Sequence, residues 1–276
     1  MTVTDTETVR SNRTARADVG GRAERSLPAV GAAWFVALCL VLAACAALAT
    51  SAMPATVPFV LALGPALIAF GLAWREGGGA VRRLAKTATV RPADRRWYLV
   101  LLLPVGWALA AVAVAVALGQ TSAGLFDKLT PTALIVPLVV LVPAFAEELA
   151  WRGYALPRAM SVLSPLQASL ALGIPWALMH LVLQLPGGIN AEASWWPTIV
   201  SVVAYSIILT WIFIGTGGSV LITALVHTGL NGVVPLMWGV NTEAAWEIRA
   251  VLAAVIALTI VALGGLRAEE DHRRPG

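Results

Sequence analysis

The sequence predicts an all-α fold, a polytopic transmembrane bundle of about eight helices, and three observations carry this prediction. The chain of 276 residues is 59% hydrophobic and 12% charged, whereas a soluble domain is roughly half apolar and a quarter charged. The apolar residues form runs of about 20, the length that crosses a bilayer as a helix. The basic residues lie in loops and tails, so the net charge of +4 does not indicate nucleic-acid binding.

The predicted elements follow one another with short connections. Residues 1–28 are polar and are expected to be a disordered cytoplasmic tail. Residues 29–266 are expected to form one transmembrane domain, and residues 267–276 a charged cytoplasmic tail. Residues 119–131 read as a loop with some amphipathic character. The predicted spans are 29–50, 54–74, 97–118, 132–150, 165–185, 197–215, 216–238 and 249–266.

The distribution of charge predicts the orientation in the membrane, because cytoplasmic loops collect Lys and Arg. With both termini in the cytoplasm, 17 of the 19 basic residues fall on the cytoplasmic side, all but Lys128 and Arg249. Seven of these lie between Arg75 and Arg96, which is therefore expected to be a basic cytoplasmic loop. The chain is expected to be a multi-pass protein of the cell membrane.

Two adjacent glutamates are the most informative residues of the chain. Glu147 and Glu148 end an uncharged run that starts at Thr132, and Arg152 follows. A charged side chain at mid-membrane costs about 2.5–3.5 kcal/mol on insertion scales, so such residues are usually functional. Three further residues with ionisable or amide side chains lie within the apolar runs, and they are His180, His227 and Asn231.

Spacing converts these residues into a geometric prediction. Glu148 and Arg152 are four apart on a helix and can pair, while Glu147 points about 100° away from Glu148. His227 and Asn231 are also four apart and share a helix face. If the three helices converge, they enclose a polar cavity with a carboxylate, two imidazoles and an amide.

Two chemistries suit such a cavity, and the residue types leave both open. A shielded carboxylate can act as a general base toward water, with histidine and asparagine orienting the water or stabilising an oxyanion. The carboxylate and both imidazoles, Glu147, His180 and His227, could instead hold a zinc ion that carries the water. Each residue also has a structural alternative, such as a snorkelling Arg152 or a histidine that bridges helices.

Several protease and nucleotide-binding classes are excluded by missing motifs. The sequence contains no His-Glu-x-x-His pair, no aspartate within a predicted span and no Gly-x-Ser-Gly nucleophile motif. These absences exclude zincin-type, paired-aspartate and rhomboid-type proteases. It also lacks a Walker A or Gly-x-Gly-x-x-Gly loop.

At these residues the sequence resembles the CPBP family, which comprises CAAX proteases and bacteriocin-processing enzymes and is also called the Abi family. Its Glu-Glu-x-x-x-Arg motif is matched by Glu147 to Arg152, and its His-x-x-x-Asn motif by His227 to Asn231. Its Phe-x-x-x-His motif is matched with Trp176 in place of the phenylalanine before His180, and Trp151 likewise replaces a common phenylalanine. The similarity covers roughly residues 132–238.

The resemblance implies a helical intramembrane endopeptidase that cleaves a membrane-associated protein or peptide in the bilayer, with a cavity open toward the cytoplasm. In this family Glu147 would activate water, and Glu148 with Arg152 would support it. His180 would join Glu147 in holding the water or a metal, and His227 with Asn231 would stabilise the oxyanion. Family members have been described both as metalloproteases and as metal-independent glutamate proteases, so zinc is an open expectation.

Two other functions compete with peptide hydrolysis. The chain could be a non-catalytic scaffold or self-immunity protein that keeps the family fold. It could also be a proton-coupled transporter that uses Glu147 and Glu148 as carriers, although the sequence shows no long internal repeat of the kind found in such transporters.

Overall fold

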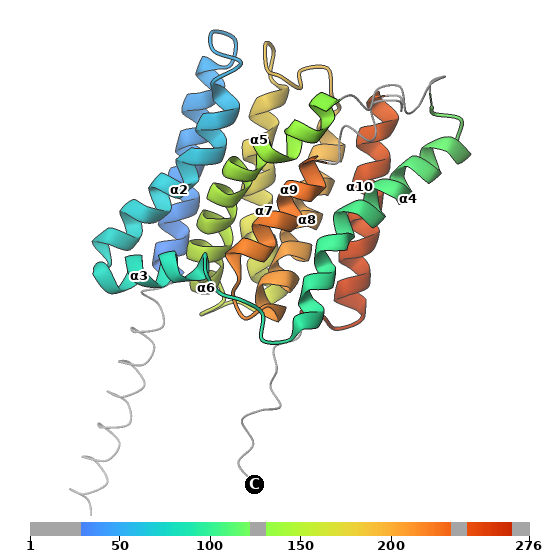
Figure 1. Cartoon of the computed structure of the whole chain (residues 1–276). Helices are drawn as coiled ribbons and strands as arrows, with labels where there is room; N and C mark the ends of the chain where they lie inside the picture. The colour runs from blue at the N-terminus through green and yellow to red at the C-terminus, as the bar shows by residue number, and fades with distance from the viewer. Residues whose placement is uncertain (1–28, 122–130, 233–241, 267–276) are drawn as a thin grey trace, which may run out of the picture.

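The computed structural model describes residues 29–121, 131–232 and 242–266, and it is a bundle of helices running side by side (Figure 1). The predicted tails, 1–28 and 267–276, lie outside the described residues. The elements are the helix Ala29–Ala49, α2 (Val57–Arg75), α3 (Gly78–Thr87), η1 (Arg95–Leu102), α4 (Leu103–Ala117), α5 (Pro131–Glu148), η2 (Leu149–Ala155), α6 (Leu156–Ala159), α7 (Pro165–Leu181), η3 (Val182–Gln184), α8 (Trp195–Gly215), α9 (Val220–Gly232) and α10 (Thr242–Ala262).

A helix lies within each of the eight predicted spans, which confirms the all-α membrane fold. Six stretches are long and apolar enough to cross a membrane: Ala29–Ala49, Val57–Arg75, Arg95–Ala117, Pro165–Gln184, Trp195–Gly215 and Thr242–Ala262. The remaining two predicted spans, 132–150 and 216–238, contain α5 and the shorter apolar helix α9. The chain is therefore a multi-pass membrane protein.

Two predicted boundaries are wrong for a shared reason. The last helix begins at Thr242 rather than at 249, and the predicted basic loop contains the ten-residue helix α3 and the start of η1. Hydropathy reports whether a segment is apolar, not whether it is helical. Helical turns that contain charged residues, such as Glu247 in the last helix and Arg82 in α3, were therefore predicted as loop.

The helices that carry the glutamates and His227 form the centre of the bundle. α5 packs along α9, with α2 and α4 on either side, and α8 packs between α7 and α10. Many of the contacts are made by fully buried alanines, including Ala69, Ala108, Ala150 and Ala177. Small residues let transmembrane helices approach closely, which compensates for the missing hydrophobic drive in lipid.

A tight turn connects α8 to α9 and fixes the start of the helix that bears His227. Gly217 and Gly218 have φ values of 70° and 96°, which side chains with a Cβ rarely adopt. The hydroxyl of Thr216 accepts a hydrogen bond from the backbone N–H of Ser219, one residue before α9 begins. The short link predicted between these two helices is thus present.

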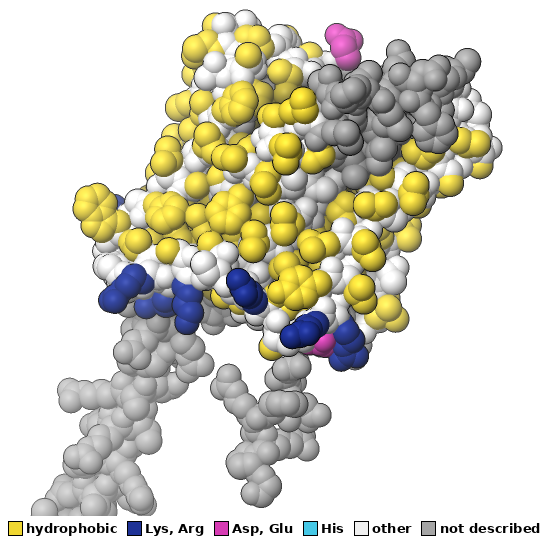
Figure 2. Space-filling model, in the orientation of Figure 1, with side chains coloured by type: hydrophobic (Ala, Val, Ile, Leu, Met, Phe, Trp, Pro, Cys, Tyr) yellow, Lys and Arg dark blue, Asp and Glu magenta, His cyan; other side chains and the backbone are white. Residues whose placement is uncertain are grey.

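Basic side chains gather at one end of the bundle, and hydrophobic ones cover the face above them (Figure 2). Exposed arginines and a lysine of α3 and its surroundings make up this end: Arg75, Arg82, Arg83, Lys86, Arg91, Arg95 and Arg96. Exposed apolar residues such as Leu48 and Trp74 face outward along the helices, as lipid-facing residues do. Lys and Arg collect on the cytoplasmic side of membrane proteins, so this end is the predicted cytoplasmic one. The orientation in the membrane stays a prediction.

Candidate active site

The Glu-Glu-x-x-x-Arg motif lies where an α-helix changes into a π-helix. Glu147 and Glu148 are the last residues of α5, and Arg152 is at the middle of the seven-residue π-helix Leu149–Ala155. α5 also contains Pro137 and Pro143, each of which removes a backbone hydrogen bond. π-Helical turns are rare and occur often at functional sites.

Glu148 is the acceptor at the centre of the site. Its Oε1 atom accepts a hydrogen bond from Arg152 at 3.0 Å and another from Nδ1 of His227, also at 3.0 Å. All three side chains are at most 2% exposed. The pairing of Glu148 with Arg152 was predicted from spacing and is confirmed. The bond to His227 was missed, because spacing relates residues on one helix only.

Glu147 faces the other nitrogen of the same imidazole. Its Oε2 atom lies 3.7 Å from Nε2 of His227, so His227 stands between the two adjacent carboxylates. A carboxylate accepts hydrogen bonds but cannot donate them, so Nδ1 of His227 carries the hydrogen bonded to Glu148. In the neutral imidazole, Nε2 then presents its lone pair toward Glu147.

His180 is held by a different partner. Its Nδ1 atom lies 2.9 Å from the carbonyl oxygen of Trp176, one turn back on α7, and this carbonyl can only accept. Nδ1 therefore carries the hydrogen, and Nε2 is left as an acceptor. The half-buried ring lies close enough to Glu147 to interact with it electrostatically, and so does Cys39, a fully buried residue of the first helix.

Trp176 fills the space between the two histidines. Its ring meets His180 and His227 edge to face at 5.5 Å and 5.4 Å, and the Arg152 guanidinium lies 4.5 Å from its centroid. The side chain is 2% exposed, and its indole N–H has no partner within the described part of the chain. This arrangement fixes both imidazoles by packing.

Asn231 lies one turn after His227 on α9 and is half-buried. Within the described residues, no hydrogen bond or ion pair joins it to Glu147, His180 or His227. The structure thus brings Glu147, Glu148, Arg152 and His227 together, with His180 nearby and Asn231 on the adjoining turn.

A hydrogen-bonded group at the basic end fixes the far side of the π-helix. Tyr154 donates to Oε1 of Glu76 at 2.7 Å, and Arg158 pairs with the same carboxylate while donating to the Tyr154 carbonyl. Burial alone would raise the pKa of Glu76, but the hydrogen bonds from Arg158 and Tyr154 outweigh it and hold that pKa below its ordinary value. No sequence signal links Glu76 to residues 78 and 82 positions away.

A catalytic zinc takes three protein ligands and a water. Among the residues that the structure describes, no group of three or more His, Cys, Asp or Glu side chains is positioned to hold a metal. Nδ1 of His227 is bonded to Glu148, and Nε2 lies 3.7 Å from the Glu147 carboxylate. Metal-bound histidines commonly have a carboxylate on the second nitrogen as well, so zinc binding stays a prediction.

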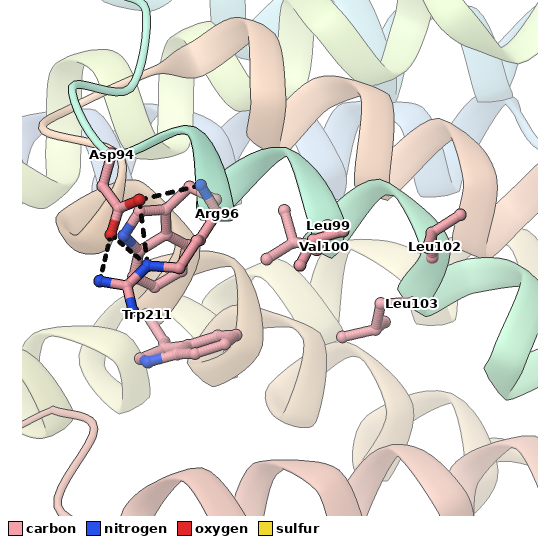
Figure 3. A pocket seen from close by; sticks show the side chains of 8 residues that line it. Asp94, Arg96, Leu99, Val100, Leu102, Leu103 and Trp211 are labelled. Carbon is pink, nitrogen blue, oxygen red and sulfur yellow. Dashed lines mark hydrogen bonds and ion pairs between the residues drawn. The ribbon is translucent and has the colours of Figure 1, made fainter.

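An open groove of about 680 Å³ lies elsewhere, along η1 and the end of α8. Figure 3 shows the Asp94–Arg96 ion pair at one end of it and leucines along its length. Its floor includes Trp97 and Trp211, whose ring centroids are 4.9 Å apart. None of the motif residues lines this groove, so it is not the cavity predicted around Glu147.

Comparisons with known proteins agree with the motif positions. A family model described as "Type II CAAX prenyl endopeptidase Rce1-like" matches residues 129–233, which contain all six predicted site residues. The chain is also 30% identical over 100 residues to CAAX prenyl protease 2 of Methanococcus maripaludis. That match covers 34% of this chain and 37% of the archaeal protein, so the chain matches well under half of that relative's length.

These matches support the CAAX protease part of the predicted resemblance. Its metalloprotease and bacteriocin-processing parts stay predictions. Residues 129–233 of this chain are therefore similar to the type II CAAX prenyl endopeptidases.

Proposed function

We propose that the chain is an intramembrane endopeptidase in which Glu147 activates a water molecule. One observation carries the proposal, namely the position of His227 between Glu148 and Glu147. A separation of 3.7 Å between His227 Nε2 and Glu147 Oε2 is too long for a hydrogen bond. It lets one water lie about 2.8 Å from both atoms.

In the proposed reaction, Glu147 takes a proton from this water as its oxygen attacks the peptide carbonyl carbon. The C–N bond then breaks as Glu147 returns the proton to the leaving amine. Glu148 holds His227 in the tautomer whose Nε2 accepts from the water, much as a buried carboxylate orients the histidine of a serine protease. His180 offers a second acceptor, and Asn231 an amide that could stabilise the oxyanion.

We further propose that the substrate is a membrane-associated protein or peptide, with a prenylated CAAX C-terminus as the first candidate. This choice follows the name of the archaeal relative and the family description. No specific observation favours the scaffold or transporter alternatives.

The test compares Glu147→Gln with Glu192→Gln in proteoliposomes that contain a farnesylated CAAX peptide. Both changes replace a carboxylate by an amide, but Glu192 is exposed and outside the site. We expect Glu147→Gln to lower the rate by at least about 10²-fold, as loss of a general base does, and Glu192→Gln to leave it unchanged. Comparing membrane peptides in cells with wild-type or Glu147→Ala protein would reveal other substrates. Equal cleavage by wild type and Glu147→Gln would reject the proposal.

A further inference from the structure

A second buried arginine lies outside the motif cluster, where α4, α8 and α10 meet. The guanidinium carbon of Arg249 is 5.3 Å from the ring centroid of Trp107 and 5.2 Å from that of Trp246. Tyr205 of α8 lies beside this guanidinium, with its ring 6.4 Å from that of Trp107. Arg249 was predicted at the outer end of the last span, but it is 8% exposed and lies two turns inside the span Thr242–Ala262.

Within the described residues, three buried polar groups of this cluster meet no acceptor in good hydrogen-bond geometry. They are Nε of Arg249, the indole nitrogen of Trp107 and the hydroxyl of Tyr205, which lies close enough to the guanidinium to interact with it. Guanidinium and indole groups can only donate. Buried polar groups in proteins are otherwise paired in the great majority of cases, so three orphans in one place require an explanation.

The aromatic rings beside Arg249 do not satisfy these donors. A ring attracts the face of the guanidinium, whereas the N–H groups lie in its plane and need acceptor atoms. Arg152 shows the difference, because it lies over Trp176 and also donates to Glu148. Arg249 has the rings but, among the described residues, no carboxylate partner.

We propose that Arg249, Trp107 and Tyr205 form an oxyanion-binding site inside the bundle, which takes a carboxylate or phosphate group. One such group supplies several lone pairs and neutralises the buried charge, whereas a water supplies lone pairs alone. The anion could come from a phospholipid of the bilayer or from the aqueous phase. The site involves none of the motif residues, so the proposal does not depend on the peptidase reaction.

The indole N–H of Trp107 reports directly on this site, because its resonance shifts when an acceptor binds. Wild-type protein labelled with ¹⁵N-tryptophan would be titrated in detergent with sodium acetate and with inorganic phosphate. It would also be compared in nanodiscs of phosphatidylglycerol and of phosphatidylcholine. Trp107→Phe identifies the resonance.

We expect a saturable shift of the Trp107 signal with acetate or phosphate if the anion is aqueous. We expect it with phosphatidylglycerol alone if the anion is a lipid headgroup. Arg249→Gln should weaken binding at least about tenfold and Tyr205→Phe about fivefold, as loss of charged and neutral hydrogen bonds does. Arg96→Gln removes the same charge from an exposed side chain and should leave the affinity unchanged.

Folding of each variant is checked by size exclusion and helical circular dichroism. If Arg249→Gln does not fold, Arg249→Lys keeps the charge, loses the planar donors and should still weaken binding. A Trp107 resonance that moves with none of the probes overturns the proposal and leaves the cluster to internal water. Equal shifts in the Arg249→Gln and Arg96→Gln proteins would overturn it as well.

Discussion

Nδ1 of His227 lies 3.0 Å from Oε1 of Glu148, across the contact between α9 and the end of α5. The two residues are 79 positions apart in the chain. This bond gives the second glutamate a task beyond pairing with Arg152, since it selects which nitrogen of His227 faces Glu147. The two adjacent carboxylates thereby hold opposite sides of one imidazole.

Replacing Glu148 by Gln should therefore reverse the tautomer of His227. The amide can donate to Nδ1, which would put the hydrogen on Nε2 and remove the acceptor that faces Glu147. We expect the cleavage rate to fall by up to about 10⁴-fold, the loss caused by the wrong histidine tautomer in a serine protease. Rates would be measured with saturating substrate, and ¹⁵N-histidine spectra would show the tautomer. A slow variant with the wild-type tautomer would contradict this role.

Trp176 should tolerate the family's phenylalanine but not loss of the ring. Trp176→Phe keeps an aromatic edge between His180 and His227, and we expect activity within about tenfold of wild type. Trp176→Ala leaves a cavity under both imidazoles and the Arg152 guanidinium, at a cost of about 3–5 kcal/mol of stability. Thermal unfolding and cleavage rates of the two variants would be compared. An active Trp176→Ala protein would show that the ring does not position the histidines.

The sequence predicted the helices better than the contacts between them. Apolar runs and charge locate membrane helices, and the spacing of Glu148 and Arg152 implies their pairing because both lie on one helix. The bond from Glu148 to His227 and the contact of Glu76 with Tyr154 join segments about 80 residues apart. Such contacts depend on how whole helices pack, which periodicity does not encode. The burial of Arg249 was missed for the same reason, since it depends on contacts with Trp107 of α4 and Tyr205 of α8.

Zinc is expected to be dispensable for cleavage. Among the described residues, no three His, Cys, Asp or Glu side chains are grouped closely enough to hold a metal ion. We predict less than one zinc per chain by elemental analysis, and unchanged cleavage after dialysis against a chelator. The prediction would be contradicted if the wild-type protein contained one zinc per chain and both the His180→Ala and the His227→Ala proteins contained none. Glu147, His180 and His227 would then be the zinc ligands.

The Glu76 carboxylate should make stability fall in acid. Its pKa is below the ordinary 4.5 in the folded protein, so its contribution is complete above that value. The contribution is lost as pH falls through the folded-state pKa, because the protonated acid pairs poorly with Arg158. We predict that the difference in Tm between wild type and Glu76→Gln narrows as pH is lowered from 6 to 3, in steps of about half a unit. A difference that stays constant with pH would show that the ion pair does not stabilise the fold.

Gly229 should be needed for the close approach of α9 to α4, two residues from His227. A Cβ at this position would lie 2.6 Å from Cγ of Pro104, a ring that cannot turn away. Overpacking of this kind costs about 1–3 kcal/mol, and displacement of α9 would also lengthen the contacts of His227. We expect Gly229→Ala to lower both Tm and the cleavage rate. Gly106→Ala is the matched control, because its Cβ on α4 would meet nothing within 4 Å. It should leave activity unchanged, and equal behaviour of the two variants would show that the α4–α9 distance does not control the site.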